Sequence, residues 1–148
     1  MAVDDKTWTD TVTWLLVFFG WVAVHRATLI RDRRKEKREV SMKICTDIAE
    51  LQSAAIDFHT SSHFNARKST DLAQQVERII LRLQKPPLSE LNIPRARMVT
   101  LRRRITKHNI DLTDFKSQPA DSEIIFGIRN AATDLTILIE DTRECVWK

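Results

Sequence analysis

The sequence has few residues that end helices or form tight turns. Its 148 residues include only 2 glycines and 4 prolines, and tyrosine is absent. A fold built from β-hairpins needs Gly, Asn-Gly or Asp-Gly at its turns, and a phosphate-binding loop is also rich in glycine, so neither is expected. Apolar residues (43%) and charged residues (30%) occur in ordinary globular proportions, which excludes collagen-like and low-complexity chains. We therefore expect an all-α protein.

Cysteine is also scarce. Cys45 and Cys145 are the only two, and their wide separation predicts free thiols rather than a disulfide framework. His59 and His63 have the i, i+4 spacing of zinc ligands on one helix face. No third ligand lies nearby in the sequence, and no Glu follows His59 as it does in the H-E-x-x-H motif. We therefore predict no metal site, no cofactor and no small-molecule substrate.

The positive charge is concentrated in the middle of the chain. Residues 26–108 contain 19 Lys and Arg against 9 Asp and Glu, whereas residues 109–148 contain 4 against 8. The net charge of the whole chain is +4. A basic middle followed by an acidic end predicts either ion pairing within the protein or an anionic partner for the basic part.

A long apolar segment lies near the N-terminus. Residues 11–25 contain no Asp, Glu, Lys or Arg, and residues 11–30 would form a helix about 30 Å long, which matches the hydrocarbon thickness of a bilayer. Arg26 is close enough to the end for its side chain to extend to the lipid headgroups. Trp8 and Trp14 near the other end are typical of an interfacial aromatic belt. We predict a transmembrane helix over residues 11–30.

Three other interpretations of this segment fit less well. A cleaved signal peptide begins with basic residues and ends at small ones, but this N-terminus is acidic and no A-x-A site follows. A surface amphipathic helix needs a polar face, and here the apolar side chains surround the helix. A buried core helix is the third alternative, because the uncharged run is shorter than most spans.

The flanking charges predict the orientation of the span. Seven Lys and Arg lie between Arg26 and Arg38, whereas the first ten residues contain one lysine. Because basic residues are retained in the cytoplasm, residues 1–10 should form a short external tail and residues 31–148 a cytoplasmic domain. The predicted location is the cell membrane, with a bacterial inner membrane as the best match.

The cytoplasmic part should be helical throughout. Apolar periodicity and breaker residues predict helices over about 31–58, 70–85, 94–108 and 121–146. The first would continue from the span as a charged juxtamembrane helix, because no Gly or Pro interrupts residues 31–58. An antiparallel helical bundle is the simplest arrangement for these four segments.

Two sets of residues suggest self-association. Residues with heptad spacing, as in a coiled coil, form a candidate assembly face: Ile44, Ile48, Leu51 and Ala55. Small residues in the span form a candidate close-packing face: Gly20, Ala23 and Ala27. The alternative is that the heptad face packs inside its own bundle, and that alanine is simply common in membrane spans.

The most basic stretch is the predicted third helix. It contains no acidic residue, and it carries Arg95, Arg97, Arg102, Arg103, Arg104 and Lys107. These side chains could form ion pairs with the acidic fourth helix, contact anionic membrane lipid, or bind nucleic acid. Nucleic acid is disfavoured because this stretch has no aromatic residue to stack on bases.

No catalytic constellation can be recognised, so we do not expect an enzyme. The sequence favours a single-span, membrane-anchored helical module that interacts with or regulates a protein partner, or a second copy of itself, at the cytoplasmic membrane face. The alternatives are a membrane-perturbing effector of the toxin or lysis type and a membrane-tethered nucleic-acid binder.

Overall fold

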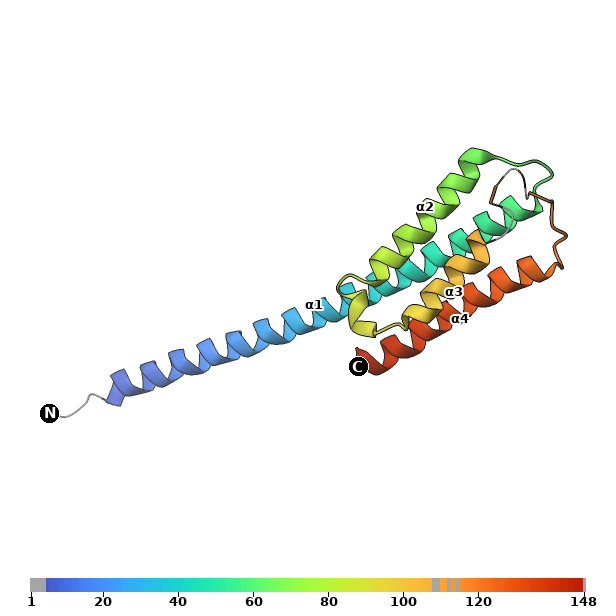
Figure 1. Ribbon diagram of the computed structural model, residues 1–148. Coiled ribbons are helices and arrows are strands. Elements are labelled where there is room, and N and C mark those ends of the chain that lie inside the picture. Colours follow the sequence, from blue (N-terminus) through green and yellow to red (C-terminus); the bar gives the residue numbers. More distant parts are fainter. Residues whose placement is uncertain (1–4, 108–109, 112, 114, 148) are drawn as a thin grey trace. The chain divides into compact units, whose positions relative to one another are not determined.

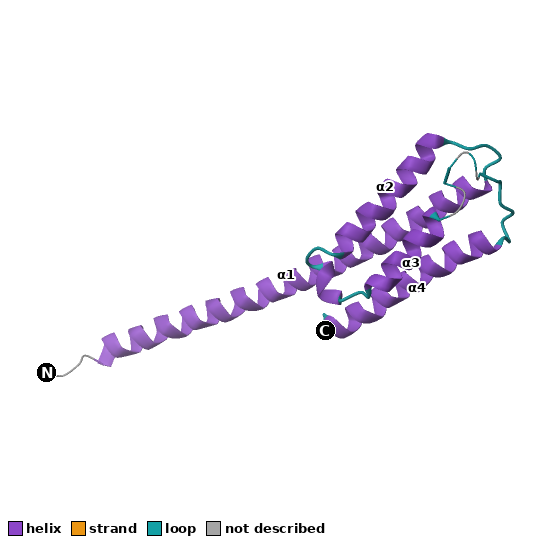
Figure 2. Cartoon of the chain, viewed as in Figure 1, coloured by secondary structure: helices purple, strands orange, loops and turns teal. Residues whose placement is uncertain are grey.

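The computed structural model describes the backbone of residues 5–107, 110–111, 113 and 115–147, and the side chains of these residues from Val12 onward. Four α-helices follow one another: α1 (Asp5–Thr60), α2 (Ala66–Leu83), α3 (Arg95–Thr106) and α4 (Glu123–Val146). A short 3-10 helix, η1 (Leu88–Leu91), lies between α2 and α3 (Figure 1). The described residues contain no β-strand (Figure 2), which confirms the all-α prediction.

The chain forms two compact units, residues 1–36 and residues 37–148, and α1 contributes to both. In the first unit, large apolar side chains are exposed on all sides of the helix; Trp14 is 74% exposed, Leu16 68% and Phe19 64%. Among the described helices, α1 is the one long and apolar enough to cross a membrane, and none of its apolar stretch is buried. The side chain of Trp8 lies outside the described residues.

The second unit, which we call the helical domain, has its own hydrophobic core. Every helix in residues 37–148 contributes fully buried apolar side chains, including Ile48, Leu101, Ile128 and Leu135. Burying a side chain of this size stabilises a fold by about 1.5–3 kcal/mol. No residue of the first unit belongs to this core, so the helical domain contains within itself the apolar contacts that hold it together.

Side-chain caps fix where two helices begin. The Asn65 side chain accepts a hydrogen bond from the backbone N–H of Lys68 at 3.0 Å, so α2 begins at Ala66, several residues before the predicted start near residue 70. Ser122 caps α4 in the same way through the N–H of Ile125, close to the predicted start. The lysine and prolines at 85–87 follow the end of α2, as expected from the sequence.

Hydrogen bonds join the segment between α3 and α4 to α1 and α2 at one end of the helical domain. The Ser69 hydroxyl donates to the Ile110 carbonyl at 2.7 Å, and the backbone N–H of Gln118 donates to the His59 carbonyl at 2.8 Å. The rings of Phe58, Phe64 and Phe115 lie edge to face, with centroids 5.5–6.2 Å apart. We call this the loop end of the domain. Part of the loop predicted over residues 109–119 lies outside the described residues.

A second cluster marks the opposite end, where the helical domain joins residue 36. The Lys37 ammonium lies 2.5 Å from a Glu90 carboxylate oxygen, and the buried Trp147 indole N–H donates to the same oxygen at 3.3 Å. Lys37 also lies 5.6 Å from the centre of the Trp147 ring. We call this the junction end. Along α1 it is separated from His59 by 22 residues, or about 33 Å of helix.

Candidate anion-binding surface

The buried side of α3 determines where its charges lie. Met98, Leu101 and Ile105 recur at helical spacing, are 0–5% exposed, and hold one side of α3 against the core. The arginine and lysine side chains on the remaining surface are therefore exposed: Arg95, Arg97, Arg102, Arg103, Arg104 and Lys107. The predicted basic stretch thus forms one exposed surface on the helical domain.

Two of these six cations form ion pairs within the protein. Arg97 lies 3.3 Å from Asp134 of α4, and Arg102 lies 2.9 Å from Glu77 of α2. All four side chains are 44–57% exposed, so each pair stabilises the domain by no more than about 1 kcal/mol. Ion pairing with the acidic helix, one of the interpretations of the basic stretch, therefore applies to Arg97 but not to the whole stretch.

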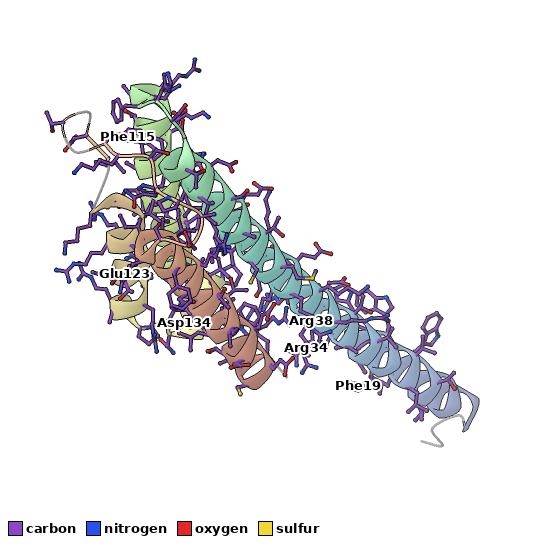
Figure 3. All side chains as sticks on the ribbon, turned by 90° about the vertical axis from the view of Figure 1, so that its right-hand side faces the viewer. Phe19, Arg34, Arg38, Phe115, Glu123 and Asp134 are labelled. Carbon is purple, nitrogen blue, oxygen red and sulfur yellow. The ribbon has the colours of Figure 1, made fainter. Side chains whose placement is uncertain are left out.

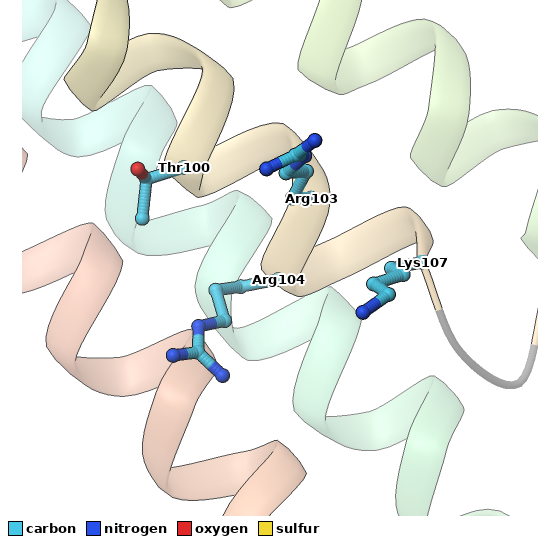
Figure 4. Close-up of a pocket in the computed structure, with 4 residues that line it drawn as sticks. All are labelled: Thr100, Arg103, Arg104 and Lys107. Carbon is cyan, nitrogen blue, oxygen red and sulfur yellow. The ribbon is translucent and has the colours of Figure 1, made fainter.

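The other four cations have no carboxylate partner among the described residues: Arg95, Arg103, Arg104 and Lys107. Three of them, together with Thr100, line a cavity of about 310 Å³ (Figure 4). Arg103 and Arg104 follow Thr100 by three and four residues, and Lys107 follows them by four and three. This spacing places all four residues on one side of the helix. We call these four residues the basic cluster. It presents three cations and a hydroxyl donor, a combination suited to carboxylates or phosphates.

Part of the basic cluster also stabilises α3 itself. Arg103 and Arg104 lie in the last turn of the helix, where the carbonyl groups carry partial negative charge. A cation there contributes about 0.3–1 kcal/mol to helix stability. This effect accounts for a positive charge near the helix end, but it does not require three cations around one cavity.

Arg104 extends from α3 toward α4 because Gly127 leaves room for it. A methyl group at Gly127 would lie 3.1 Å from Cδ and 3.2 Å from Nη1 of Arg104, which is closer than ordinary van der Waals contact. Figure 4 shows the Arg104 guanidinium over the neighbouring helix. This contact is not among the features predicted from the sequence, although a glycine inside a long helix suggests a close approach by a neighbour.

Arg104 and Thr100 also line a second cavity, of about 340 Å³, between α3 and α4. Its α4 side is formed by Glu123, Phe126, Gly127, Asn130, Ala131 and Asp134. Glu123 and Asp134, both labelled in Figure 3, mark its two ends along α4. Because Thr100 and Arg104 line both cavities, the basic cluster adjoins this α3–α4 groove.

An aromatic ring that the sequence analysis did not single out lies in this groove. Phe126 is 63% exposed although its neighbours Ile125 and Ile128 are fully buried. Its position on α4 faces away from the core, so it is part of the surface rather than of the packing. The structure thus places an exposed ring beside the basic cluster from a helix that starts 16 residues after Lys107.

The predicted assembly face has a different role in the structure. Ile44, Ile48, Leu51 and Ala55 are 0–1% exposed, because α1 packs these side chains against the other helices of its own domain. The heptad spacing therefore reflects packing within the domain, and a second chain has no access to this face. The physical reason is that one apolar stripe can be covered equally well by helices of the same chain.

The predicted span-packing residues lie in the first unit. Gly20, Ala23 and Ala27 are all exposed there, and an added methyl group at Gly20 would meet no atom within 4 Å. Their part in helix association stays a prediction.

The two histidines are not brought together as metal ligands. His59 belongs to α1, is fully buried, and donates from Nε2 to the Ile105 carbonyl at 3.2 Å. His63 is exposed and contacts the Ser62 hydroxyl through Nδ1 at 2.7 Å. No group of three or more His, Cys, Asp or Glu suited to a metal occurs in the described part of the chain.

Both cysteines are free thiols, as expected from the sequence. Cys45 is half-buried in the helical domain, and Cys145 is exposed near the end of α4. Burial raises the pKa of the Cys45 thiol; the nearby Glu140 carboxylate adds to this effect and Arg143 opposes it. A raised pKa reduces the thiolate fraction, so Cys45 is a poor nucleophile at neutral pH.

Comparison with known proteins adds no family to this description: no family model, curated protein or solved structure matches the chain.

Proposed function

We propose that this chain is a single-span membrane protein whose cytoplasmic helical domain, an antiparallel bundle, binds an anionic partner through the basic cluster. The N-terminus would lie outside and residues 31–148 inside, in a cell membrane such as a bacterial inner membrane. The exposed apolar surface of the first unit and the basic residues that follow its apolar segment support this topology.

The placement of Arg103, Arg104 and Lys107 around one open cavity, with no carboxylate partner among the described residues, is the observation that carries the binding proposal. Like charges on one side of a helix repel one another, so an arrangement of this kind is stabilised when an anion binds. The two cavities between α1 and α2 differ in this respect, because acidic and basic side chains line both of them.

Within the helical domain, the basic cluster lies near the loop end. Lys107 follows the end of α3 beside Ile105, which contacts His59 at that end of the domain. We propose a protein partner for the basic cluster, and lipid headgroups are the alternative that the competition experiment below distinguishes.

Membrane attachment can be tested on the full-length protein. After ultracentrifugation of lysed cells, we expect the chain in the membrane pellet, and we expect detergent rather than high salt to release it. A reporter fused after Lys148 should behave as cytoplasmic. Recovery of the full-length chain in the supernatant without detergent, or an external signal from the reporter, would refute the proposed topology.

Anion binding can be tested with poly-L-glutamate as a simple carboxylate probe. The double variant Arg103→Gln/Lys107→Gln should bind it more weakly than the wild type, and this difference should shrink as salt is added. The matched control is Lys85→Gln/Arg95→Gln, which removes the same charge from exposed positions elsewhere. If both double variants bind poly-L-glutamate equally, general positive charge rather than the basic cluster is responsible.

A further inference from the structure

We infer that the partner presents an acidic amphipathic helix, and that this helix docks along the α3–α4 groove with an apolar side chain against Phe126 and carboxylates on the basic cluster. This inference rests on the proposed function, because it specifies which anion the basic cluster binds. It depends on the placement of an exposed aromatic ring and of three cations, which have no carboxylate partner among the described residues, in two adjoining cavities.

The groove has the length of a short helical segment. From Glu123 to Asp134 the α4 side of the groove spans 11 residues, or about 16 Å. That length accommodates about three turns of a second helix, and such a helix places side chains at i, i+3, i+4 and i+7 along the line of contact. The α3 side is lined by Thr100 and Arg104, so a helix lying in the groove contacts both walls.

The groove is apolar where a helix would need an anchor. Phe126 lies in its lining as a 63% exposed aromatic ring, together with the small residues Gly127 and Ala131. Aromatic side chains that become buried at the centre of an interface contribute most of its binding energy. A leucine or phenylalanine of the partner that covers Phe126 would bury its own side chain and the Phe126 ring away from water.

The charges around the groove are asymmetric. Arg103, Arg104 and Lys107 lie on the α3 side, whereas Glu123 lies on the α4 side and Asp134 is already paired with Arg97. An amphipathic helix can carry carboxylates only along the edge that faces α3, and so keep them away from Glu123. A nucleic-acid strand carries a phosphate at every nucleotide and would bring negative charge close to Glu123, so the groove fits a helix better.

The test uses full-length protein in phosphatidylcholine nanodiscs and a fluorescent 14-residue helical peptide with Glu along one edge and Leu at i, i+3, i+4 and i+7. Fluorescence anisotropy should detect saturable binding. Phe126→Ala should weaken it roughly tenfold, the effect expected for a central aromatic contact. Arg103→Gln/Lys107→Gln should also weaken it, most strongly at low salt.

Matched controls separate the groove from the rest of the surface. Leu81→Ala removes an equally exposed apolar side chain from α2, and Lys85→Gln/Arg95→Gln removes two other cations; neither should alter peptide affinity. The same peptide with Gln in place of Glu should bind much more weakly. Circular dichroism at 222 nm should be unchanged in every variant, because all the replaced side chains are exposed.

Three outcomes would overturn the inference. The first is that the peptide does not bind at concentrations up to about 1 mM, which corresponds to less than about 4 kcal/mol of binding energy. The second is that Phe126→Ala has no effect while poly-L-glutamate binding still depends on the basic cluster; the proposed function would then stand without the helix. The third is that phosphatidylglycerol vesicles or a single-stranded oligonucleotide displace the peptide and bind more tightly, which would identify lipid or nucleic acid as the partner.

Discussion

The contact between Gly127 and Arg104 gives a prediction whose sign can be worked out from the structure. Gly127 lies inside α4 and does not have positive φ, so alanine can adopt its backbone conformation. Alanine is favoured over glycine by about 0.8–1 kcal/mol at an interior helix position. Against this gain, the new methyl group would lie 3.1 Å from Cδ and 3.2 Å from Nη1 of Arg104, so the arginine has to move by a few tenths of an ångström.

The cost of that movement is small because the obstructing atoms belong to the outer part of a flexible, exposed side chain. A torsion displaced by about 30° from a staggered rotamer costs about 0.5–1.5 kcal/mol, and a smaller rotation suffices here. We take the cost as about 0.5 kcal/mol. Gly127→Ala should therefore stabilise the helical domain by about 0.5 kcal/mol, which corresponds to a rise in Tm of roughly 2 °C.

A double-mutant cycle isolates this contact. Thermal unfolding of residues 37–148, followed by circular dichroism at 222 nm, would be measured for the wild type, Gly127→Ala, Arg104→Ala and the double variant. With the Arg104 atoms removed, the alanine at position 127 should contribute its full gain of about 1 kcal/mol, so the coupling energy should be about 0.5 kcal/mol. A loss of 1 kcal/mol or more in Gly127→Ala, or additive effects in the double variant, would refute the proposed packing.

Other features of the helical domain give further predictions. Leu101→Ala should destabilise it by about 2–5 kcal/mol, since Leu101 is fully buried; a loss below about 1 kcal/mol in urea unfolding would contradict this placement in the core. The hydrogen bond from Lys37 holds the pKa of Glu90 below its usual range, so the stabilisation from this pair should be complete above about pH 4.5 and lost as pH falls through the lower, folded-state pKa. If Glu90→Gln changes the thermal midpoint by the same amount at pH 3 and at pH 6, the pair does not provide this pH-dependent stabilisation. Iodoacetamide should label the exposed Cys145 well before Cys45, whose thiol has a raised pKa. Mass spectrometry of partly labelled protein measures the order, and earlier labelling of Cys45 would contradict this prediction.

The helices themselves could be predicted from the sequence because the signals for them are local. The apolar stripe containing Leu72, Val76 and Ile79 indicated α2, and the structure buries all three side chains. The predicted start of α2 is about four residues too late. Asn65 caps the helix through a backbone turn that could not be recognised among the surrounding Ser and Thr residues. The 3-10 helix η1 could not be predicted, since four residues provide no periodicity.

The candidate site could be predicted only in part, because its geometry depends on contacts between distant residues. The basic side chains of α3 were evident, but the sequence did not show that Arg97 and Arg102 would pair with carboxylates while Arg103 and Lys107 would have no such partner among the described residues. The position of Phe126 beside them follows from the packing of α3 against α4, which periodicity does not specify. The heptad spacing around Ile48 was ambiguous for a similar reason: it indicates an apolar stripe but not which chain covers it.

The hydrogen bonds at the loop end have a consequence for how this domain can be engineered. Because Ile110 is bonded to Ser69 of α2 and Gln118 to His59 of α1, the described residues between α3 and α4 are held against these two helices. A tag or fluorescent protein inserted between α3 and α4 would disturb these bonds, even though surface loops ordinarily tolerate insertions. The exposed turn around Lys85, at the other end of α2, has no such bonds to this segment among the described contacts, and it is the better site for an internal label.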